Sequence, residues 1–429
     1  MQISKVYTMD ASPESITSGP ATDLARQVLR DERNFILSVS EFFNKSDLSD
    51  VKIKVGENSY HGHKFVLAKS SDVFRTMLYD NRWSEGDETD LILTESEECQ
   101  SVFELFLKFM YTAEVSISVD TAVGILCLAD KYNVTSLKAL CVGYMVQNTK
   151  SPKVHNALQW YNWSKALNLS PLVESCTKTI AWNMDAILGT PEWNTMDLHF
   201  IQDILKNSGL VVANEFTLFT GLAAWLLCEN HHAELRTNAQ TLLPLIRFPQ
   251  MLVSQLYTIE QSRLFEMDET TPVLKDLVNK AYRFRSLCPT QTSLDVSFDV
   301  DFYKPRNYMD LAVDSVMMQN SLRFGIQVDV KTYSGPVVTE VRNGEWKITY
   351  RKHENVWNVN LFCHDSATIN GEAFIEVSVI IYNEGEKVIQ VEMIPATKCT
   401  RTNNLCINVE VKDPAESKIM ILLIKPVPH

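Results

Sequence analysis

The chain has 429 residues, enough for roughly two to four domains, and its 45% hydrophobic and 22% charged residues are typical of a globular protein. Its 40 Lys and Arg against 53 Asp and Glu give a formal net charge of −13. Such a chain repels the phosphate backbone unless it carries a local basic cluster, and none is visible. The composition therefore excludes a largely disordered chain and disfavours nucleic-acid binding.

The nine cysteines are scattered along the chain, and no pair has the C-x-x-C spacing. Most lie on apolar faces of predicted elements, so we expect isolated, reduced thiols and a reducing compartment. Residues 1–20 lack an apolar run long enough for a signal-peptide core, and no stretch reaches the length of a membrane span. We therefore expect a soluble protein of the cytoplasm or the nucleus, without membrane insertion.

Residues 1–22 are small and polar and predict a flexible tail, and helical periodicity begins near Asp23, a suitable N-cap. Two apolar stripes follow at helical spacing. The first comprises Leu24, Val28, Phe35, Val39 and Phe42, and the second comprises Leu29, Ile36 and Phe43. Two stripes offer more apolar surface than one core needs, so the second can pack against a partner or within the same chain.

The rest of the first unit, which we place at residues 23–148, mixes strands and helices. Alternation in residues 51–55, followed by Gly-Glu-Asn, predicts a strand that enters a hairpin. A helix is predicted from Ser71, and a short strand over residues 91–93. Further helices are predicted over residues 102–111, 121–131 and 137–147. A small sheet combined with helices indicates an α+β domain.

The second unit, residues 149–287, loses the strand signal altogether. Amphipathic helices recur and are separated by Asn, Ser, Gly and Pro. Examples are residues 154–166, 172–184, 216–228 and 273–284. The pattern predicts an all-α domain.

The third unit, residues 288–429, alternates apolar and polar residues with period two. The clearest segments are residues 294–302, 322–330, 375–381 and 405–411. We expect roughly nine strands, with turns at Gly-Pro and Asn-Gly pairs. Clean alternation indicates antiparallel sheet with one solvated face, hence an all-β antiparallel sandwich or jelly roll. No repeat of blade length is present, which argues against a propeller.

Several motifs in order resemble a BTB (POZ) domain over residues 23–148. They are Leu48-Ser-Asp-Val51, His61-Gly-His-Lys64 with Phe65-Val-Leu-Ala68, then Ser71, Phe74 and Met77, Phe109-Met-Tyr-Thr112, and Leu126 to Tyr132 with Leu137 and Cys141. The helical middle is similar to a BACK domain. That match runs through Leu205, Ser208-Gly-Leu210, Asn214-Glu215, Phe219, Trp225-Leu226 and Ile246-Arg-Phe-Pro249. The third unit resembles the C-terminal β-sandwich of some BTB–BACK proteins.

This resemblance implies a homodimer that links cullin-3 to a substrate for ubiquitination, with the sandwich as the substrate-recognition domain. The BTB interface would be carried by Leu29, Ile36 and Phe43 of the first helix. The charged pair Asp50 and Lys64 would lie in a pocket near that interface. Such a pair is weak evidence for stability, because desolvation offsets the attraction between the charges.

The resemblance also implies a cullin contact in the loop after the helix that begins at Ser71. The motif there is Trp83-Ser-Glu85. Trp83 offers a large rigid apolar surface, and Glu85 can accept a charge-assisted hydrogen bond. Phe74 and Tyr111 would add to the same surface. Alternatively, Trp83 folds back on its own domain, Glu85 is solvated, and the aromatic at Tyr111 is structural.

Catalytic and metal-binding signatures do not emerge. His61 and His63 share one face of a strand, but no nearby Cys or carboxylate completes a metal site, so structural roles are favoured. No Walker loop, dinucleotide fingerprint, G-x-S-x-G or H-E-x-x-H motif is present. We therefore expect no enzyme activity, no cofactor and no metal.

Two other functions remain open. One is a non-catalytic BTB scaffold without a ligase. The other is a secreted scaffold, which glycosylation at Asn162 or Asn168 would support. Candidate substrate contacts in the third unit are residues 333–336 and Trp346, with a core position as the alternative for Trp346.

Overall fold

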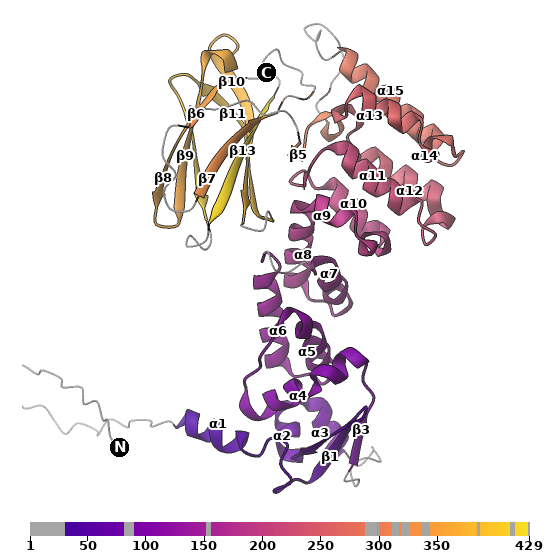
Figure 1. Cartoon of the computed structure of the whole chain (residues 1–429), viewed down its shortest axis with the longest axis vertical. Coiled ribbons are helices and arrows are strands. Elements are labelled where there is room, and N and C mark those ends of the chain that lie inside the picture. Colours follow the sequence, from indigo (N-terminus) through magenta and orange to yellow (C-terminus); the bar gives the residue numbers. More distant parts are fainter. Residues whose placement is uncertain are drawn as a thin grey trace, which may run out of the picture.

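The computed structural model describes residues 31–80, 90–151, 156–287, 298, 300–310, 317–318, 326–333, 335, 344–383, 387–411 and 417–427. Figure 1 shows an elongated molecule with the N-terminal unit at one end and the helical unit continuing from it. The C-terminal sandwich lies against the side of the helical unit. No helix in these ranges combines the length and the apolar composition that crossing a bilayer requires.

The N-terminal unit has a small sheet that its helices cover. In the described residues, β1 (Val51–Val55) lies between β2 (Asn58–Gly62), which is antiparallel to it, and β3 (Asp90–Leu93), which is parallel. The helices are α1 (Glu32–Ser40), α2 (Lys64–Ser70), α3 (Asp72–Tyr79), α4 (Glu97–Thr112), α5 (Val119–Lys131) and α6 (Thr135–Asn148). The predicted strand at residues 51–55 and the helix start at Ser71, whose hydroxyl caps α3 by accepting the Phe74 N–H, are confirmed.

The helical unit shares one continuous apolar core with the N-terminal unit. Its helices are α7 (Ala157–Ala166), α8 (Ser170–Trp182), α9 (Met184–Leu188), α10 (Leu198–Lys206), α11 (Glu215–Leu226), α12 (Leu235–Leu242), α13 (Val253–Glu260), α14 (Arg263–Glu266) and α15 (Thr271–Leu287). Asp197 caps α10 and Asn214 caps α11 through side-chain oxygens. Trp160, Trp193 and Trp225 are fully buried between these helices.

The described part of the C-terminal unit forms two four-stranded sheets. One sheet, called here the docked sheet, has the order β11–β10–β13–β7. The other, the outer sheet, has the order β12–β9–β8–β6. The bounds are β6 (Met317–Met318), β7 (Ile326–Thr332), β8 (Trp346–His353), β9 (Val356–Cys363), β10 (Glu372–Tyr382), β11 (Val388–Thr400), β12 (Leu405–Glu410) and β13 (Lys418–Pro426). Pairing is antiparallel except for β7 on β13 and β6 on β8, which confirms the predicted antiparallel sandwich.

The alternation over residues 294–302 does not give the expected strand where the structure describes it. Val300 precedes a 3-10 turn, Asp301–Tyr303. The rings of Phe298 and Tyr303 instead pack on Phe284 of α15, with centroids 4.8 and 5.1 Å away. The apolar residues here serve a contact with a helix, because an aromatic cluster satisfies them as well as a sheet core would.

Residues 300–310, called here the strap, lie against the helical unit. Within the strap, β5 (Asn307–Tyr308) pairs in parallel with β4 (Val211–Val212). Tyr308 is buried in the core that the helical unit shares with the N-terminal unit. The strap therefore enters the helical unit before the chain passes into the sandwich.

Candidate functional site

Two of the predicted contact residues in the N-terminal unit are core residues. Phe74 on α3 has no exposed surface and stacks on Tyr132, with ring centroids 4.5 Å apart. Tyr111 on α4 is 3% exposed. Neither side chain offers a surface to a partner protein, so the prediction that they contact cullin directly is corrected.

Tyr111 has a structural role that the burial explains. Its hydroxyl lies 3.0 Å from the backbone N of His63 and 2.9 Å from the Nδ1 of the same residue. Its ring packs edge-on against Phe43, with centroids 5.8 Å apart. Burial raises the pKa of the Tyr111 phenol to about 12, so the hydroxyl stays protonated. Tyr111 thus joins the segment after α1 to the segment between β2 and α2.

Trp83 and Glu85 lie in residues 81–89, outside the described residues. The elements on either side of this segment are described. Tyr79 at the end of α3 is 55% exposed, and Ile92 on β3 is 72% exposed. Both elements that flank residues 81–89 therefore present large apolar side chains to solvent.

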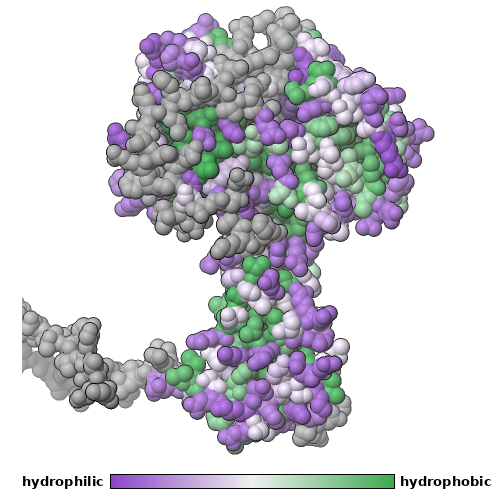
Figure 2. Space-filling view, viewed as in Figure 1, coloured by the Kyte–Doolittle hydropathy of each residue, from purple (hydrophilic) through white to green (hydrophobic). Residues whose placement is uncertain are grey.

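The first helix leaves part of its apolar surface open. Ile36 and Leu37 of α1 are 40% and 52% exposed, whereas Phe43, after the helix, packs against the core. α1 lies at the edge of the N-terminal unit in Figure 1, and Figure 2 shows apolar residues on its surface. Leu29 lies outside the described residues. Of the predicted stripe, Ile36 is therefore available to a partner, and Phe43 is largely used within the chain.

Asp50 and Lys64 come together at the start of α2. The Asp50 Oδ1 accepts the backbone N–H of Lys64 at 2.7 Å. A carboxylate is favourable there, because the first N–H groups of a helix lack partners within the helix and carry partial positive charge. Asp50 therefore stabilises the α2 N-terminus.

His63 is occupied by contacts within the chain. Its Nδ1 lies 2.9 Å from the Tyr111 hydroxyl and its Nε2 lies 2.9 Å from the backbone oxygen of Asp47. With both ring nitrogens engaged, the structure supports the structural role of this residue. Within the described ranges, no group of three or more His, Cys, Asp or Glu side chains is placed to hold a metal ion.

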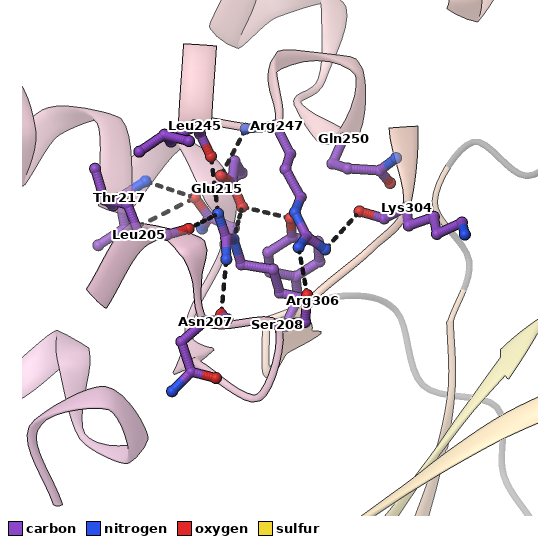
Figure 3. Close-up of polar contacts among 12 residues, drawn as sticks. Leu205, Asn207, Ser208, Glu215, Thr217, Leu245, Arg247, Gln250, Lys304 and Arg306 are labelled. Carbon is purple, nitrogen blue, oxygen red and sulfur yellow. Dashed lines mark hydrogen bonds and ion pairs between the residues drawn. The ribbon is translucent and has the colours of Figure 1, made fainter. Parts of the chain in front are cut away.

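A second cluster of charged side chains lies where the strap enters the helical unit (Figure 3). Its centre is Glu215, the first residue of α11, which is 1% exposed. The Glu215 carboxylate accepts the backbone N–H of Arg247 at 2.7 Å and the hydroxyl of Tyr308, and it lies 3.3 Å from Nε of Arg306. A buried carboxylate is tolerated only when such partners replace water.

The guanidinium groups of this cluster bind carbonyl oxygens of the helical unit. Arg306, with no exposed surface, donates to the backbone oxygens of Leu205, Asn207 and Leu245 at 2.7–2.8 Å. Arg247 donates to the Lys304 oxygen and to the Ser208 hydroxyl. Burial and the charge of Arg306 lower the pKa of Arg247, while burial and Glu215 raise the pKa of Tyr308. Glu215 therefore holds the Tyr308 hydroxyl, the Arg306 guanidinium and the Arg247 backbone N–H, which fixes the strap to the helical unit.

The sandwich contacts the helical unit through the docked sheet. Val388, Ile380 and Ile421 of this sheet form a small buried apolar cluster with Val211, against which Trp182 packs. Polar contacts also cross this junction, and each joins a residue of the sandwich to a residue of the helical unit or the strap. They are Lys387 to the Thr149 and Ser151 oxygens, Asn183 to both backbone groups of Val388, Tyr333 to the Gln250 side chain, and Lys425 to the Asn307 side chain.

Comparison with known families identifies the first two units. The BTB/POZ domain model matches residues 39–149, and the BACK model (BTB And C-terminal Kelch) matches residues 157–261. The chain is a BTB–BACK protein. Proteins with this architecture are in general adaptors or scaffolds rather than catalysts.

Several curated relatives share a long match with this BTB–BACK protein. BTB/POZ domain-containing protein 17 of Mus musculus is 27% identical over 305 residues, which cover 70% of this chain and 61% of the relative. The Xenopus laevis protein of the same name is 26% identical, covering 73% and 66%. Kelch-like protein 28 of Homo sapiens is 26% identical, covering 73% and 57%. The matches thus span about three-fifths of the length of these relatives.

Sequence patterns missed the junction of the BTB–BACK protein. Glu215 follows a helix cap, where acidic residues are common, so the sequence pattern does not indicate that its side chain is buried. Arg306 lies in a polar segment with no periodicity. Tyr333, predicted as an exposed substrate contact, is fully buried, so that prediction is wrong. Trp346 is 3% exposed, which confirms the alternative that it is a core residue. Pro336 lies outside the described residues.

Proposed function

We propose that this BTB–BACK protein is a homodimeric substrate adaptor of a cullin-3 ubiquitin ligase. The observation that carries the proposal is the order of a BTB and a BACK domain on one continuous core, followed by a separate sandwich. The BTB domain would dimerise and bind cullin, and the sandwich would bind the substrate. An adaptor of this kind needs no chemistry of its own, because holding the substrate near the ligase raises its effective concentration.

Dimerisation is proposed to use the open apolar surface of α1. Ile36 and Leu37 are the exposed apolar residues there, and burying such side chains against a second copy removes them from water. Leu29 would extend the same surface. We expect Ile36→Asp with Leu37→Asp to weaken the dimer at least tenfold in sedimentation analysis. Leu252→Asp, at another exposed apolar position on the BACK domain, is the matched control.

Cullin binding is proposed to use Trp83 and Glu85, which lie between α3 and β3 in the sequence. The exposed side chains of Tyr79 and Ile92 on the flanking elements support an apolar binding surface around this segment. Removing an anchoring Trp from an interface commonly costs 2 kcal/mol or more, roughly thirtyfold in affinity. We therefore expect Trp83→Ala with Glu85→Lys to lower affinity for the cullin N-terminal region about thirtyfold or more.

The control for this experiment is Tyr257→Ala, which removes an exposed aromatic from α13 of the BACK domain. Wild-type protein that does not bind cullin, while still dimerising, would contradict the adaptor function and favour a scaffold without a ligase. A double variant that binds as tightly as the wild type would instead show that the cullin surface lies elsewhere.

Substrate binding is assigned to the sandwich because its orientation is fixed. The docked sheet packs on the BACK domain, so a substrate on the outer sheet would be held in a constant position relative to the BTB domain. The eight cysteines in the described ranges are free, which supports a reducing compartment such as the cytoplasm or the nucleus.

A further inference from the structure

Two cysteines of the sandwich lie at the same end of the two sheets. Cys363 is the last residue of β9 in the outer sheet, and Cys399 is next to the end of β11 in the docked sheet. Directly after β11 the chain turns and enters β12, which pairs with β9 from Leu405 opposite Leu361. The crossing brings the ends of β9 and β11 together.

Both thiols point into the core between the sheets. Cys363 is 4% exposed and Cys399 has no exposed surface. The Cys399 Sγ lies 3.9 Å from the backbone oxygen of Leu361, two residues before Cys363, and 3.6 Å from that of Asn403 in the turn. Cys363 and Cys399 belong to the same buried core cluster, and Cys399 contributes to the raised pKa of the Cys363 thiol, so the two thiols are neighbours. Both thiols are free and buried, as the sequence predicts, but within this pair they are not isolated from each other.

A disulfide forms only between cysteines that lie close together, and these two thiols are buried side by side at neighbouring strand ends of the two sheets. We propose that Cys363 and Cys399 are a redox pair that forms an inter-sheet disulfide when the chain meets a diffusible disulfide such as glutathione disulfide. The inference does not depend on cullin binding or on the adaptor function.

The reaction is a two-step thiol–disulfide exchange. The thiolate of one cysteine attacks a sulfur of glutathione disulfide, its S–S bond breaks, and one glutathione thiolate leaves. The second cysteine then attacks the protein sulfur of the mixed disulfide and releases the second glutathione. The protein loses two protons and two electrons, and one glutathione disulfide becomes two glutathione molecules.

Burial sets the rate of this exchange. It raises the pKa of the Cys363 thiol to about 12, so little thiolate is present at neutral pH, and an oxidant reaches the pair only when the end of the sandwich opens. The pair therefore stays reduced during brief exposure to an oxidant and forms the disulfide only when the exposure is sustained. Once formed, the bond is shielded from reductants by the same packing and ties the two sheets together.

The test uses the full chain carrying Cys406→Ser, because Cys406 is the exposed cysteine among those that the structure describes in the sandwich and would otherwise form mixed disulfides. The protein is incubated with glutathione disulfide or with dithiothreitol at mildly alkaline pH over several days, alkylated, and digested without reduction. We expect a cross-linked peptide pair joining Cys363 to Cys399 in the oxidised sample alone. We also expect the sandwich to melt higher by on the order of 10 °C, since the bond restricts the unfolded chain.

A matched variant, Cys399→Ala in the same background, should give no cross-link and no rise in melting temperature. A parallel sample in urea below the unfolding transition makes opening of the sandwich more frequent and should speed the reaction. Recovery of Cys363 and Cys399 as separately alkylated thiols in both samples would overturn the proposal. Recovery of the two as independent glutathione adducts would overturn it equally.

Discussion

The two domain junctions of this chain are built in different ways. Between the BTB and BACK domains, α6 contacts α8, and residues such as Cys141, Met145, Leu172 and Cys176 are fully buried in one apolar core. Between the BACK domain and the sandwich, the apolar cluster is small, and buried charged or amide groups make most of the specific contacts. The first junction is an extension of a core, and the second is a set of individual polar connections.

This difference has a physical consequence. Apolar contacts are non-directional and tolerate small shifts, so their loss is gradual. A buried charge that loses one partner keeps its full desolvation cost, so a polar junction fails at single residues. Substitutions and pH should therefore act on the sandwich junction more strongly, residue for residue, than on the BTB–BACK junction.

Truncation should have the largest effect. A chain ending at Leu287 lacks Arg306 and Tyr308, which leaves the buried Glu215 carboxylate without two of its partners and β4 without its paired strand. We expect it to be less stable to urea than a chain ending at Asp310 by more than about 5 kcal/mol, or to aggregate. Circular dichroism during urea unfolding measures the difference.

Both truncated chains lack the sandwich, so only residues 288–310 distinguish them. Equal unfolding midpoints would show that the strap is not part of the BACK fold. On the structure, we propose to place the domain boundary after Asp310. An experiment that removes the sandwich to test substrate binding should cut there.

Arg306→Ala should have the next largest effect. It removes the bonds to three carbonyl oxygens and leaves Glu215 with less charge compensation in a dry site. Loss of one partner from a buried charged group typically destabilises by about 3–5 kcal/mol. Thermal and urea unfolding measure it, and Arg283→Ala on the exposed surface of α15 is the control.

A double variant sharpens this prediction. Arg306→Met with Glu215→Gln removes both charges while preserving much of the volume, so it should be more stable than Arg306→Ala alone. If the double variant is as unstable as the single one, the carbonyl contacts rather than the ion pair dominate the junction.

Sequence patterns predicted the elements of this chain better than its contacts. The strand at residues 51–55 and the cap at Ser71 were predictable because alternation and capping are local properties. Arg306 binds carbonyl oxygens of Leu205 and Leu245, which lie 101 and 61 residues before it in the sequence. No periodicity encodes such pairs, and a backbone oxygen can belong to any residue type.

The burial of aromatic side chains was the other feature that the sequence did not predict. Phe74 and Tyr111 fall where the family resemblance implies a partner contact, yet both face the core. A helical stripe identifies an apolar face but not whether the same chain or a partner covers it, which is why Ile36 and Phe43, on one stripe, have different environments. Burial becomes visible only when the packing of the whole unit is known.

pH should act on the sandwich junction through Lys425. Burial lowers the pKa of this lysine to about 8, against about 10.5 in an unfolded chain. Between pH 8 and pH 10.5 this lysine is protonated more fully in the unfolded state than in the folded state. The free energy of unfolding therefore increases as pH rises through this range and decreases as pH falls. Buried thiols such as Cys141, whose pKa is raised to about 12, have the opposite effect, because they lower the free energy of unfolding as pH rises.

The measurement is therefore a difference between two proteins. We expect the free energy of unfolding of the wild type, relative to Lys425→Met, to increase by about 2 kcal/mol between pH 7.5 and pH 9.5. The variant keeps the thiols, so their contribution cancels. A difference that is constant with pH would mean that Lys425 is hydrated at this junction, and the contrast with the BTB–BACK junction would lose its electrostatic part.

The smallest expected effect comes from Asn183, the residue after α8. Its side-chain amide donates to the backbone oxygen of Val388, and its carbonyl accepts the Val388 N–H at 2.9 Å. Replacement by Ala leaves both groups of a buried residue without this partner, so we expect a loss of about 1–2 kcal/mol. Asn230→Ala, at an exposed position, is the control.

Hydrogen exchange locates the effect of Asn183→Ala. Because about 1.4 kcal/mol corresponds to a factor of ten, the amide of Val388 should exchange roughly ten times faster in the variant. Amides of α6, which contacts α8 through the shared apolar core, should keep their protection. If α6 lost protection to the same extent, the two junctions would open as one unit, and the polar contacts would not act independently of the core beneath them.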